Sequence, residues 1–143
     1  MDANTVELLK ECSRGCQMAM ESVKKMREYA EDPRLNSLLE AYGEKHRSLE
    51  RSIKEELDKY DEKEGEPAKM AEAMAGGMMR MKMMLHPDDT QVAKIMMDGC
   101  NMGIQSVSGY LNRYPDASDR GQKLAKELIR IEEEFMREMK GFV

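Results

Sequence analysis

The feature that most constrains the fold of this 143-residue chain is a long-range internal repeat. The stretch Lys10–Met18 (KECSRGCQM) resembles the stretch Lys94–Met102 (KIMMDGCNM), with Cys16 and Cys100 at equivalent places 84 positions apart. Further matches pair Ser22-Val23 with Ser106-Val107 and Asp32-Pro33 with Pro115-Asp116. A repeat of this length predicts two copies of one helical hairpin, packed about a pseudo-twofold axis. We therefore expect Cys16 to superpose on Cys100.

Apolar residues spaced three and four apart predict two long helices in the first half of the chain. The first is predicted over 5–31, with Asn4 as its N-cap and Glu7 completing a capping box. The Asp32-Pro33 pair should end this helix and begin the next, which runs into a charged loop at 61–67. The residues predicted to face inward are Leu9, Cys12, Cys16, Ala19, Val23, Met26, Ala30, Leu35, Leu38, Tyr42, His46, Leu49, Ile53 and Tyr60.

The second half of the chain predicts a crossover segment and a second hairpin. A methionine-rich, mostly helical crossover is expected over 67–86, with a kink at Gly76-Gly77 and a stop at Pro87. The third helix should begin at Asp88 or Asp89 and the fourth near Ser118. Their predicted inward residues are Val92, Met96, Cys100, Gly103, Val107, Tyr110, Tyr114, Leu124, Leu128, Ile131, Phe135 and Phe142. The prediction is one all-α domain over 1–143, with hairpins 5–60 and 89–142.

Composition excludes several classes of protein. A hydrophobic content of 41% is enough for one core, and a net charge of −5 without a basic face argues against nucleic-acid binding. No apolar run reaches the roughly 18 to 20 residues of a membrane span, and the first residues lack the pattern of a signal peptide. Three cysteines, two of them four apart on one helix, favour reduced thiols over disulfides. We expect a cytoplasmic, bacterial-type protein.

Two antiparallel hairpins joined by a long crossover form the topology of ferritin-like four-helix bundles. The stretches 7–15 and 32–49, together with the helix around Gly99, resemble an uncharacterised bacterial domain family of unknown function within the ferritin-like superfamily. The resemblance covers about 6–135 and implies the fold. That family supplies no catalytic residues that could be transferred to this chain.

The superfamily also implies a di-iron site, built from a Glu on each of two helices and a Glu-x-x-His on each of the other two. This chain departs from that pattern, because Cys16 and Cys100 stand where the lone Glu residues are expected, and Gly43 precedes His46 by three positions. The last helix has no histidine. Other nearby carboxylates are predicted to lie mostly on solvated faces; they are Glu44, Glu50, Glu132 and Glu133.

The departures create a different candidate site. Cys16 and His46 lie at similar distances from the first hairpin turn, so antiparallel pairing predicts that they share a level and both point inward. With the repeat-equivalent Cys100 and the pair formed by Cys12 and Met96, they would offer soft donors to Cu(I) or Zn(II). The alternative is ordinary core packing, since free cysteine is among the most buried residue types. In that case His46 should be hydrogen-bonded to a neighbour such as Tyr42 or a Glu.

The methionine tract allows two further interpretations. One stripe of it can pack on the bundle; it comprises Met70, Met74, Met78, Met81 and Leu85. Met79 and Met83 face elsewhere and predict an interface with a second copy or another protein, whereas a Cu(I) role is the alternative.

Catalytic motifs are absent from the sequence, and Arg14 is predicted to point to a different face from Cys16, so a catalytic cysteine is not expected. The chain is therefore predicted to be a non-enzymatic structural or interaction protein that self-associates as a homodimer. The alternatives are a soft-metal binding or storage module and a degenerate di-iron protein.

Overall fold

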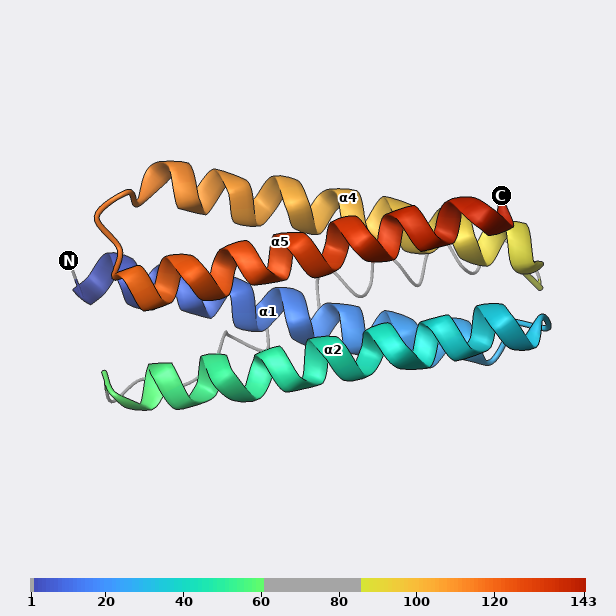
Figure 1. Cartoon of the computed structure of the whole chain (residues 1–143), viewed down its shortest axis with the longest axis horizontal. Helices are drawn as coiled ribbons and strands as arrows, with labels where there is room; N and C mark the ends of the chain where they lie inside the picture. The colour runs from blue at the N-terminus through green and yellow to red at the C-terminus, as the bar shows by residue number, and fades with distance from the viewer. Residues whose placement is uncertain (1, 61–85) are drawn as a thin grey trace.

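The computed structural model describes residues 2–60 and 86–143, and this part of the chain is all-helical (Figure 1). The helices are α1 (Asp2–Arg27), α2 (Pro33–Asp58), α4 (Asp89–Arg113), α5 (Asp119–Met139) and the 3-10 turn η1 (Lys140–Phe142). The predicted all-α bundle is confirmed at this level. Most of the predicted crossover, its kink at Gly76-Gly77 and the predicted interface residues Met79 and Met83 lie outside the described residues.

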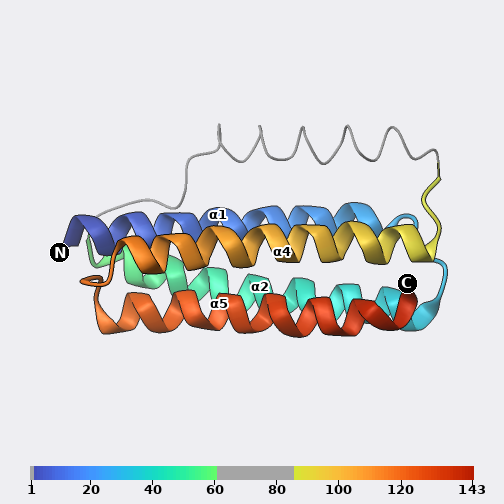
Figure 2. The same cartoon turned by 90° about the horizontal axis from the view of Figure 1, so that it is seen from above.

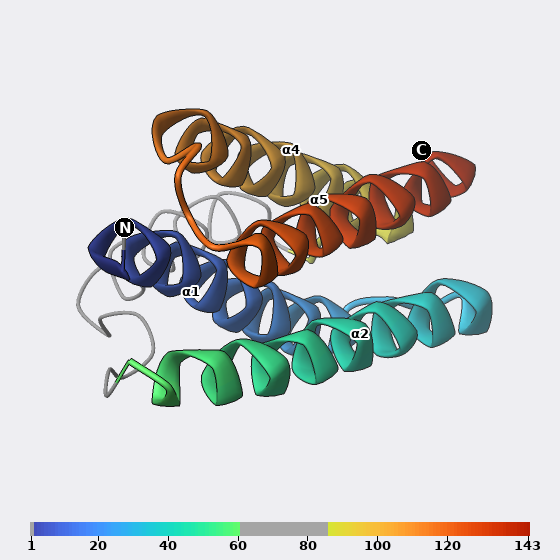
Figure 3. The same ribbon diagram turned by 60° about the vertical axis from the view of Figure 1, so that its left-hand side comes forward.

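The four long helices pair as two antiparallel hairpins that lie one on the other. Helices α1 and α2 form one hairpin and α4 and α5 form the other (Figure 3). Across the two layers, α1 packs against α4 and α2 against α5 (Figure 2). Helices α2 and α4 run in the same direction, so α2 ends and α4 begins at opposite ends of the bundle (Figure 1).

The helix starts follow local capping chemistry. The Asp32 side chain accepts a 2.8 Å hydrogen bond from the Arg34 N–H and precedes Pro33, as predicted. Asp88 forms a capping box with Gln91, and Ser118 caps α5, which resolves the choice left open between residues 88 and 89.

The predicted start of the first helix is wrong. Helix α1 begins at Asp2, three residues before the predicted position, and ends at Arg27 instead of residue 31. Asn4 lies inside the helix, where its amide donates to Asp116 at 3.0 Å instead of capping its own helix. A contact between distant parts of the chain therefore replaces the local capping box.

Each hairpin makes a hydrogen bond to the turn of the other hairpin. Asp89, in the first turn of α4, accepts a 3.0 Å hydrogen bond from the Asp32 N–H in the first hairpin turn. At the other end of the bundle, the Thr5 hydroxyl oxygen of α1 accepts a 2.9 Å bond from the Ser118 N–H in the second turn. Asp89 lies 84 positions after Thr5, so the two acceptors occupy equivalent positions of the repeat. The donors do not, because Ser118 corresponds to Arg34 and not to Asp32, so the two contacts are similar in kind but match position by position only at the acceptor.

The core forms where the predicted apolar stripes meet. Most predicted inward residues are buried, although Leu39 replaces Leu38 as the fully buried leucine of its turn. Tyr42 stacks on Phe135 with ring centroids 4.7 Å apart and joins α2 to α5. Within residues 2–60 and 86–143, no helix is both long enough and apolar enough to cross a bilayer.

Candidate functional site

A buried histidine and glutamate pair lies in the middle of the bundle. His46 of α2 is fully buried, and its Nε2 lies 2.6 Å from Oε1 of Glu132 on α5, which is 5% exposed. The other ring nitrogen, Nδ1, lies 2.7 Å from the Tyr42 carbonyl oxygen. The expectation that His46 is hydrogen-bonded to Tyr42 or a Glu is confirmed, because it bonds to both.

These contacts fix how many protons the pair holds. A carbonyl oxygen only accepts, so Nδ1 of His46 must carry a proton and donate it to Tyr42. A bare Nε2 and an ionised Glu132 would be two acceptors facing each other, so a second proton must lie between them. The pair is therefore neutral overall, either as imidazolium with carboxylate or as imidazole with carboxylic acid.

The three cysteines are buried as protonated thiols, and Cys100 contacts this pair directly. Cys100 of α4 donates to Glu132, and burial, followed by the charge of Glu132 and this hydrogen bond, raises the pKa of the Cys100 thiol. Burial and the charge of Glu11 raise the pKa of Cys12 to about 12. Burial also raises the pKa of Cys16 well above its usual range, with smaller contributions from Cys12, Glu50 and Glu132. Nucleophilic chemistry, which needs a thiolate, is therefore suppressed at neutral pH.

A second buried carboxylate, Glu50, lies opposite the middle of α1. Its Oε1 accepts hydrogen bonds from Ser13 Oγ at 3.3 Å and from Gln17 Nε2 at 3.2 Å, and these two residues flank Cys16. The antiparallel pairing of α1 and α2 thus brings Glu50 to the turn of α1 that holds Cys16, one turn along α2 from His46.

The expectation that the nearby glutamates are solvated is wrong for two of the four. Glu50 and Glu132 are 6% and 5% exposed, whereas Glu44 and Glu133 lie on exposed surface. The signal was present in the spacing, because Glu50 lies four residues after His46 and Glu132 lies four residues after the core residue Leu128. Both positions belong to the inward face of a helix that packs against more than one neighbour.

The predicted soft-donor residues are all in the core, but the structure gives them different partners. Cys12, Cys16, His46, Met96 and Cys100 are each buried. Across residues 2–60 and 86–143, no three side chains of His, Cys, Asp or Glu come together closely enough to hold a metal ion. The residues around His46 also do not match a di-iron set, since cysteines replace two carboxylates and α5 supplies Glu132 without a histidine.

A cavity of about 300 Å³ opens between α1 and α4 beside Glu132. Eight of its lining residues form repeat-equivalent pairs 84 positions apart: Gly15 with Gly99, Met18 with Met102, Ala19 with Gly103, and Ser22 with Ser106. The pseudo-twofold axis therefore passes through the cavity. Its inner wall is not symmetric, because Cys100, Glu132 and Phe135 line it from one side.

One rim of this cavity is polar and held by an internal network. Arg14 is buried and pairs with Glu11 at 2.7 Å, and Glu11 also accepts a 2.6 Å hydrogen bond from the Ser106 hydroxyl. Burial lowers the pKa of Arg14, but the hydrogen bond and charge of Glu11 outweigh that effect and the net pKa is raised. The guanidinium is thus a permanent charge that is already paired.

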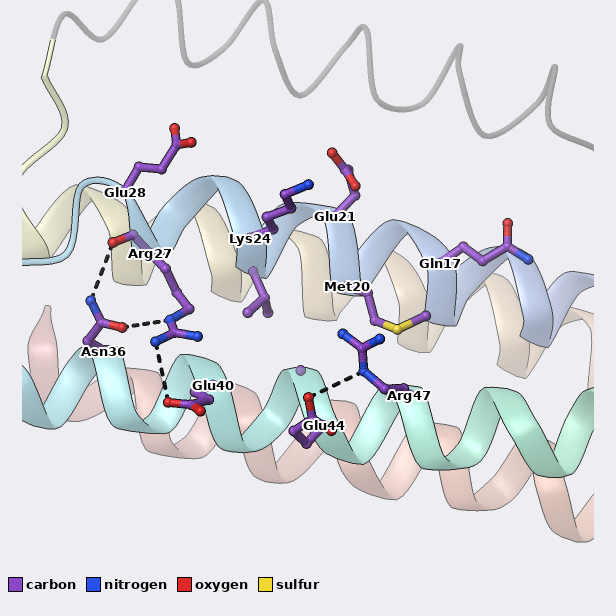
Figure 4. A pocket seen from close by; sticks show the side chains of 12 residues that line it. Gln17, Met20, Glu21, Lys24, Arg27, Glu28, Asn36, Glu40, Glu44 and Arg47 are labelled. Carbon is purple, nitrogen blue, oxygen red and sulfur yellow. Dashed lines mark hydrogen bonds and ion pairs between the residues drawn. The ribbon is translucent and has the colours of Figure 1, made fainter.

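A wider surface hollow of about 670 Å³ lies between α1 and α2 (Figure 4). Four of its charged side chains pair with one another: Arg27 contacts Glu40 at 3.3 Å, and Arg47 contacts Glu44 at 3.3 Å. Arg27 also donates a 2.7 Å hydrogen bond to Asn36. Because these charges are paired with neighbours and exposed to water, this hollow is a solvated groove between two helices. It is a weaker candidate for a functional site than the α1–α4 cavity.

No protein-family model, curated protein or solved structure matches this chain. The resemblance to a ferritin-like family therefore stays a prediction based on the repeat, the crossover length and the positions of small residues.

Proposed function

We propose that this chain is a non-enzymatic helical-bundle interaction protein that self-associates as a homodimer in the bacterial cytoplasm. Its inclusion in the ferritin-like superfamily is part of the same proposal. The observation that carries the proposal is the unequal distribution of apolar side chains on α4.

Helix α4 carries more apolar surface than its own bundle covers. Its buried residues are Val92, Ala93, Met96, Cys100 and Val107. Five further large apolar residues of α4 are not fully buried: Ile95 and Met102 share one face of the helix, and Met97, Ile104 and Leu111 share another. Ile95, Met97 and Leu111 pack partly against the core. Met102 is 59% exposed, the largest exposure of any large hydrophobic residue in the described chain. A second copy that packs on the face of Met102 would remove this apolar surface from water.

The chemistry of the interior supports a non-enzymatic role. The polar groups around Glu132 form hydrogen bonds with one another: His46 bonds to Tyr42 and Glu132, and Cys100 bonds to Glu132. The thiols are held protonated by burial, which is the opposite of the low pKa that a nucleophilic cysteine needs.

Sedimentation velocity of the full chain over a concentration series tests self-association. We expect a dimer whose dissociation constant rises at least tenfold in Met102→Glu, because a buried charge at the interface is unfavourable. The matched control is Gln105→Glu, which adds the same charge at an exposed position of the same helix. A protein that is monomeric at every concentration, or equal effects of the two substitutions, would contradict the proposal.

The predicted contribution of Met79 and Met83 to the interface is tested in the same experiment. Replacing both by Glu should yield a monomer with an unchanged far-ultraviolet circular dichroism spectrum. A dimer that survives this double substitution but dissociates in Met102→Glu would assign the interface to α4 alone.

The second candidate function is soft-metal binding or storage, with Cu(I) or Zn(II) as the ion. It is favoured by the hydrogen bonds that His46 and Cys100 both make to Glu132. Cys16 also lies close enough to this carboxylate for its charge to raise the pKa of the Cys16 thiol. Binding would require His46 to give up its hydrogen bond to Glu132 and the thiols to lose their protons. Elemental analysis of protein purified anaerobically without an affinity tag tests this candidate directly.

A further inference from the structure

The α1–α4 cavity has the properties of a site for a small molecule. Its volume of about 300 Å³ is at the lower end of the range for ligand pockets. Its inner lining combines apolar side chains with one buried carboxylate, Glu132, and one buried thiol, Cys100, and its rim carries the paired Arg14 and Glu11. An apolar pocket with a few converging polar groups is the usual form of a small-molecule site.

Gly99, which lines the cavity, leaves open space and is not needed for close helix packing. A Cβ atom added to Gly99 would meet no heavy atom within 4 Å. Gly43 shows the contrast, because a Cβ there would lie 3.1 Å from Cγ1 of Val23 where α1 and α2 approach closely. Gly15 stands at the equivalent position on the other wall, but a Cβ there would lie 3.4 Å from Cδ2 of Leu128, so of this pair it is Gly99 that leaves the space open.

The charge state of the inner wall decides what kind of molecule fits. Glu132 and His46 form a neutral pair, and the lining charges Arg14 and Glu11 are already paired with each other, so an ammonium or carboxylate group of a ligand would meet no unpaired charge in the cavity. A carboxylate offers about four acceptor positions, and the bonds from His46 and Cys100 use two of them. The wall can therefore accept one more hydrogen bond from a neutral donor.

The volume sets the size of the molecule. An apolar cavity of about 150 Å³ in another protein holds benzene, so about 300 Å³ corresponds to two fused rings, or about twelve non-hydrogen atoms. The near-symmetric walls, built from Met18 and Met102 on opposite sides, suit a flat molecule with a long apolar body.

We infer that the α1–α4 cavity binds a neutral bicyclic or similarly sized apolar molecule that carries one hydroxyl group, with the hydroxyl donating to Glu132. The site is built from one chain, so the inference goes beyond the proposed self-association and does not depend on it. Binding would place the apolar body against the methionines and the hydroxyl at the inner wall.

The probe is 2-naphthol, with naphthalene as the analogue that lacks the hydroxyl. The chain contains no Trp, so the fluorescence of 2-naphthol can be followed with little interference from the protein. We expect a one-to-one complex with a dissociation constant below about 100 µM and at least tenfold weaker binding of naphthalene.

The decisive variant is Gly99→Leu, which fills the cavity without a clash and should weaken binding of 2-naphthol at least tenfold. Its control is Gly109→Leu on the same helix, where an added Cβ also meets no atom within 4 Å but does not line the cavity. The control should bind like the unmodified protein. Both variants gain the same helix propensity, so a difference between them reports the cavity alone.

Absence of binding by the unmodified protein up to about 1 mM, or equal binding by the two variants, would overturn the inference. Equal binding of naphthalene and 2-naphthol would also overturn it, because the hydroxyl contact to Glu132 is part of the claim. Sedimentation of the same samples shows whether Gly99→Leu alters the oligomeric state, so failure of self-association and failure of ligand binding are distinguished.

Discussion

The buried pair of His46 and Glu132 makes a quantitative prediction about stability. In Glu132→Leu, Nε2 of His46 would lose its partner in a site that is fully buried. Breaking a buried pair by removing one member costs about 3 to 5 kcal/mol of the free energy of unfolding. His46→Leu should cost a similar amount, since the carboxyl of Glu132 then keeps only the weak donor Cys100.

Removing both members should cost much less than the sum of the two single changes. The double variant leaves neither group unpaired, and the Tyr42 carbonyl retains its backbone bond from residue 46 within α2. We expect a loss of about 1 kcal/mol or less, and thus a coupling energy of at least about 5 kcal/mol between the two positions.

Glu132→Gln is the informative third variant. A glutamine amide can donate to Nε2 of a neutral His46 while Nδ1 keeps its bond to Tyr42, so the loss should be only about 1 kcal/mol. Urea unfolding at pH 7, followed by circular dichroism at 222 nm, measures all four variants. Additive effects of the two leucine substitutions, or a loss below about 1 kcal/mol in Glu132→Leu, would refute the description of the pair as coupled and internally satisfied.

Three further changes have defined outcomes. In the folded chain the pKa of Cys12 is raised from the ordinary 9.0 to about 12, so the protonated thiol contributes its full stabilisation below pH 9. This contribution should be lost at about 1.4 kcal/mol per pH unit as the pH rises toward 12. Urea unfolding of the unmodified chain and of Cys12→Ala at pH 8 and 10 checks this. Cys16→Ser should lower the free energy of unfolding by about 1 to 3 kcal/mol without changing the metal content of the protein. If the unmodified protein instead binds Cu(I) or Zn(II) stoichiometrically, and this binding disappears in Cys16→Ser and in His46→Ala, the metal-binding alternative is favoured. Asp89→Ala should lower the free energy of unfolding by about 1 to 2 kcal/mol in thermal unfolding, because the backbone N–H groups of residues 31 and 32 lose their acceptor. The control is Asn101→Ala at an exposed position of the same helix, which should change the free energy of unfolding by less than about 0.5 kcal/mol.

The parts of the fold that depend on local chemistry could be predicted from the sequence. Asp32 with Pro33, Asp88 with Gln91, and Ser118 each cap a helix through bonds to residues a few positions away, so their pattern is visible in the chain. The start of α1 could not be found in this way, because Asn4 bonds to Asp116 across 112 positions. A local motif cannot report a partner that only the tertiary fold supplies.

The candidate site was predictable in position but not in chemistry. Periodicity placed His46, Cys16 and Cys100 in the core, and all three are buried. The same reasoning predicted that the nearby glutamates, which include Glu50 and Glu132, lie mostly on solvated faces, because a charged residue is by default expected to be exposed to solvent. Their burial depends on specific partners on other helices, Ser13 and Gln17 for Glu50 and His46 for Glu132, and pairings between helices are not encoded in the spacing along one helix.

The two halves of the chain share a scaffold but not a site. The repeat-equivalent pairs, such as Gly15 and Gly99, lie around the axis where α1 meets α4. The position equivalent to the buried His46 is Arg130, which is exposed and pairs with Glu127 and Glu134 on the surface. A twofold pair of histidines would have given two identical polar walls. With a single His46, only one wall of the cavity carries the neutral proton-sharing pair, so the inner end of the cavity differs chemically from the charged rim formed by Glu11 and Arg14.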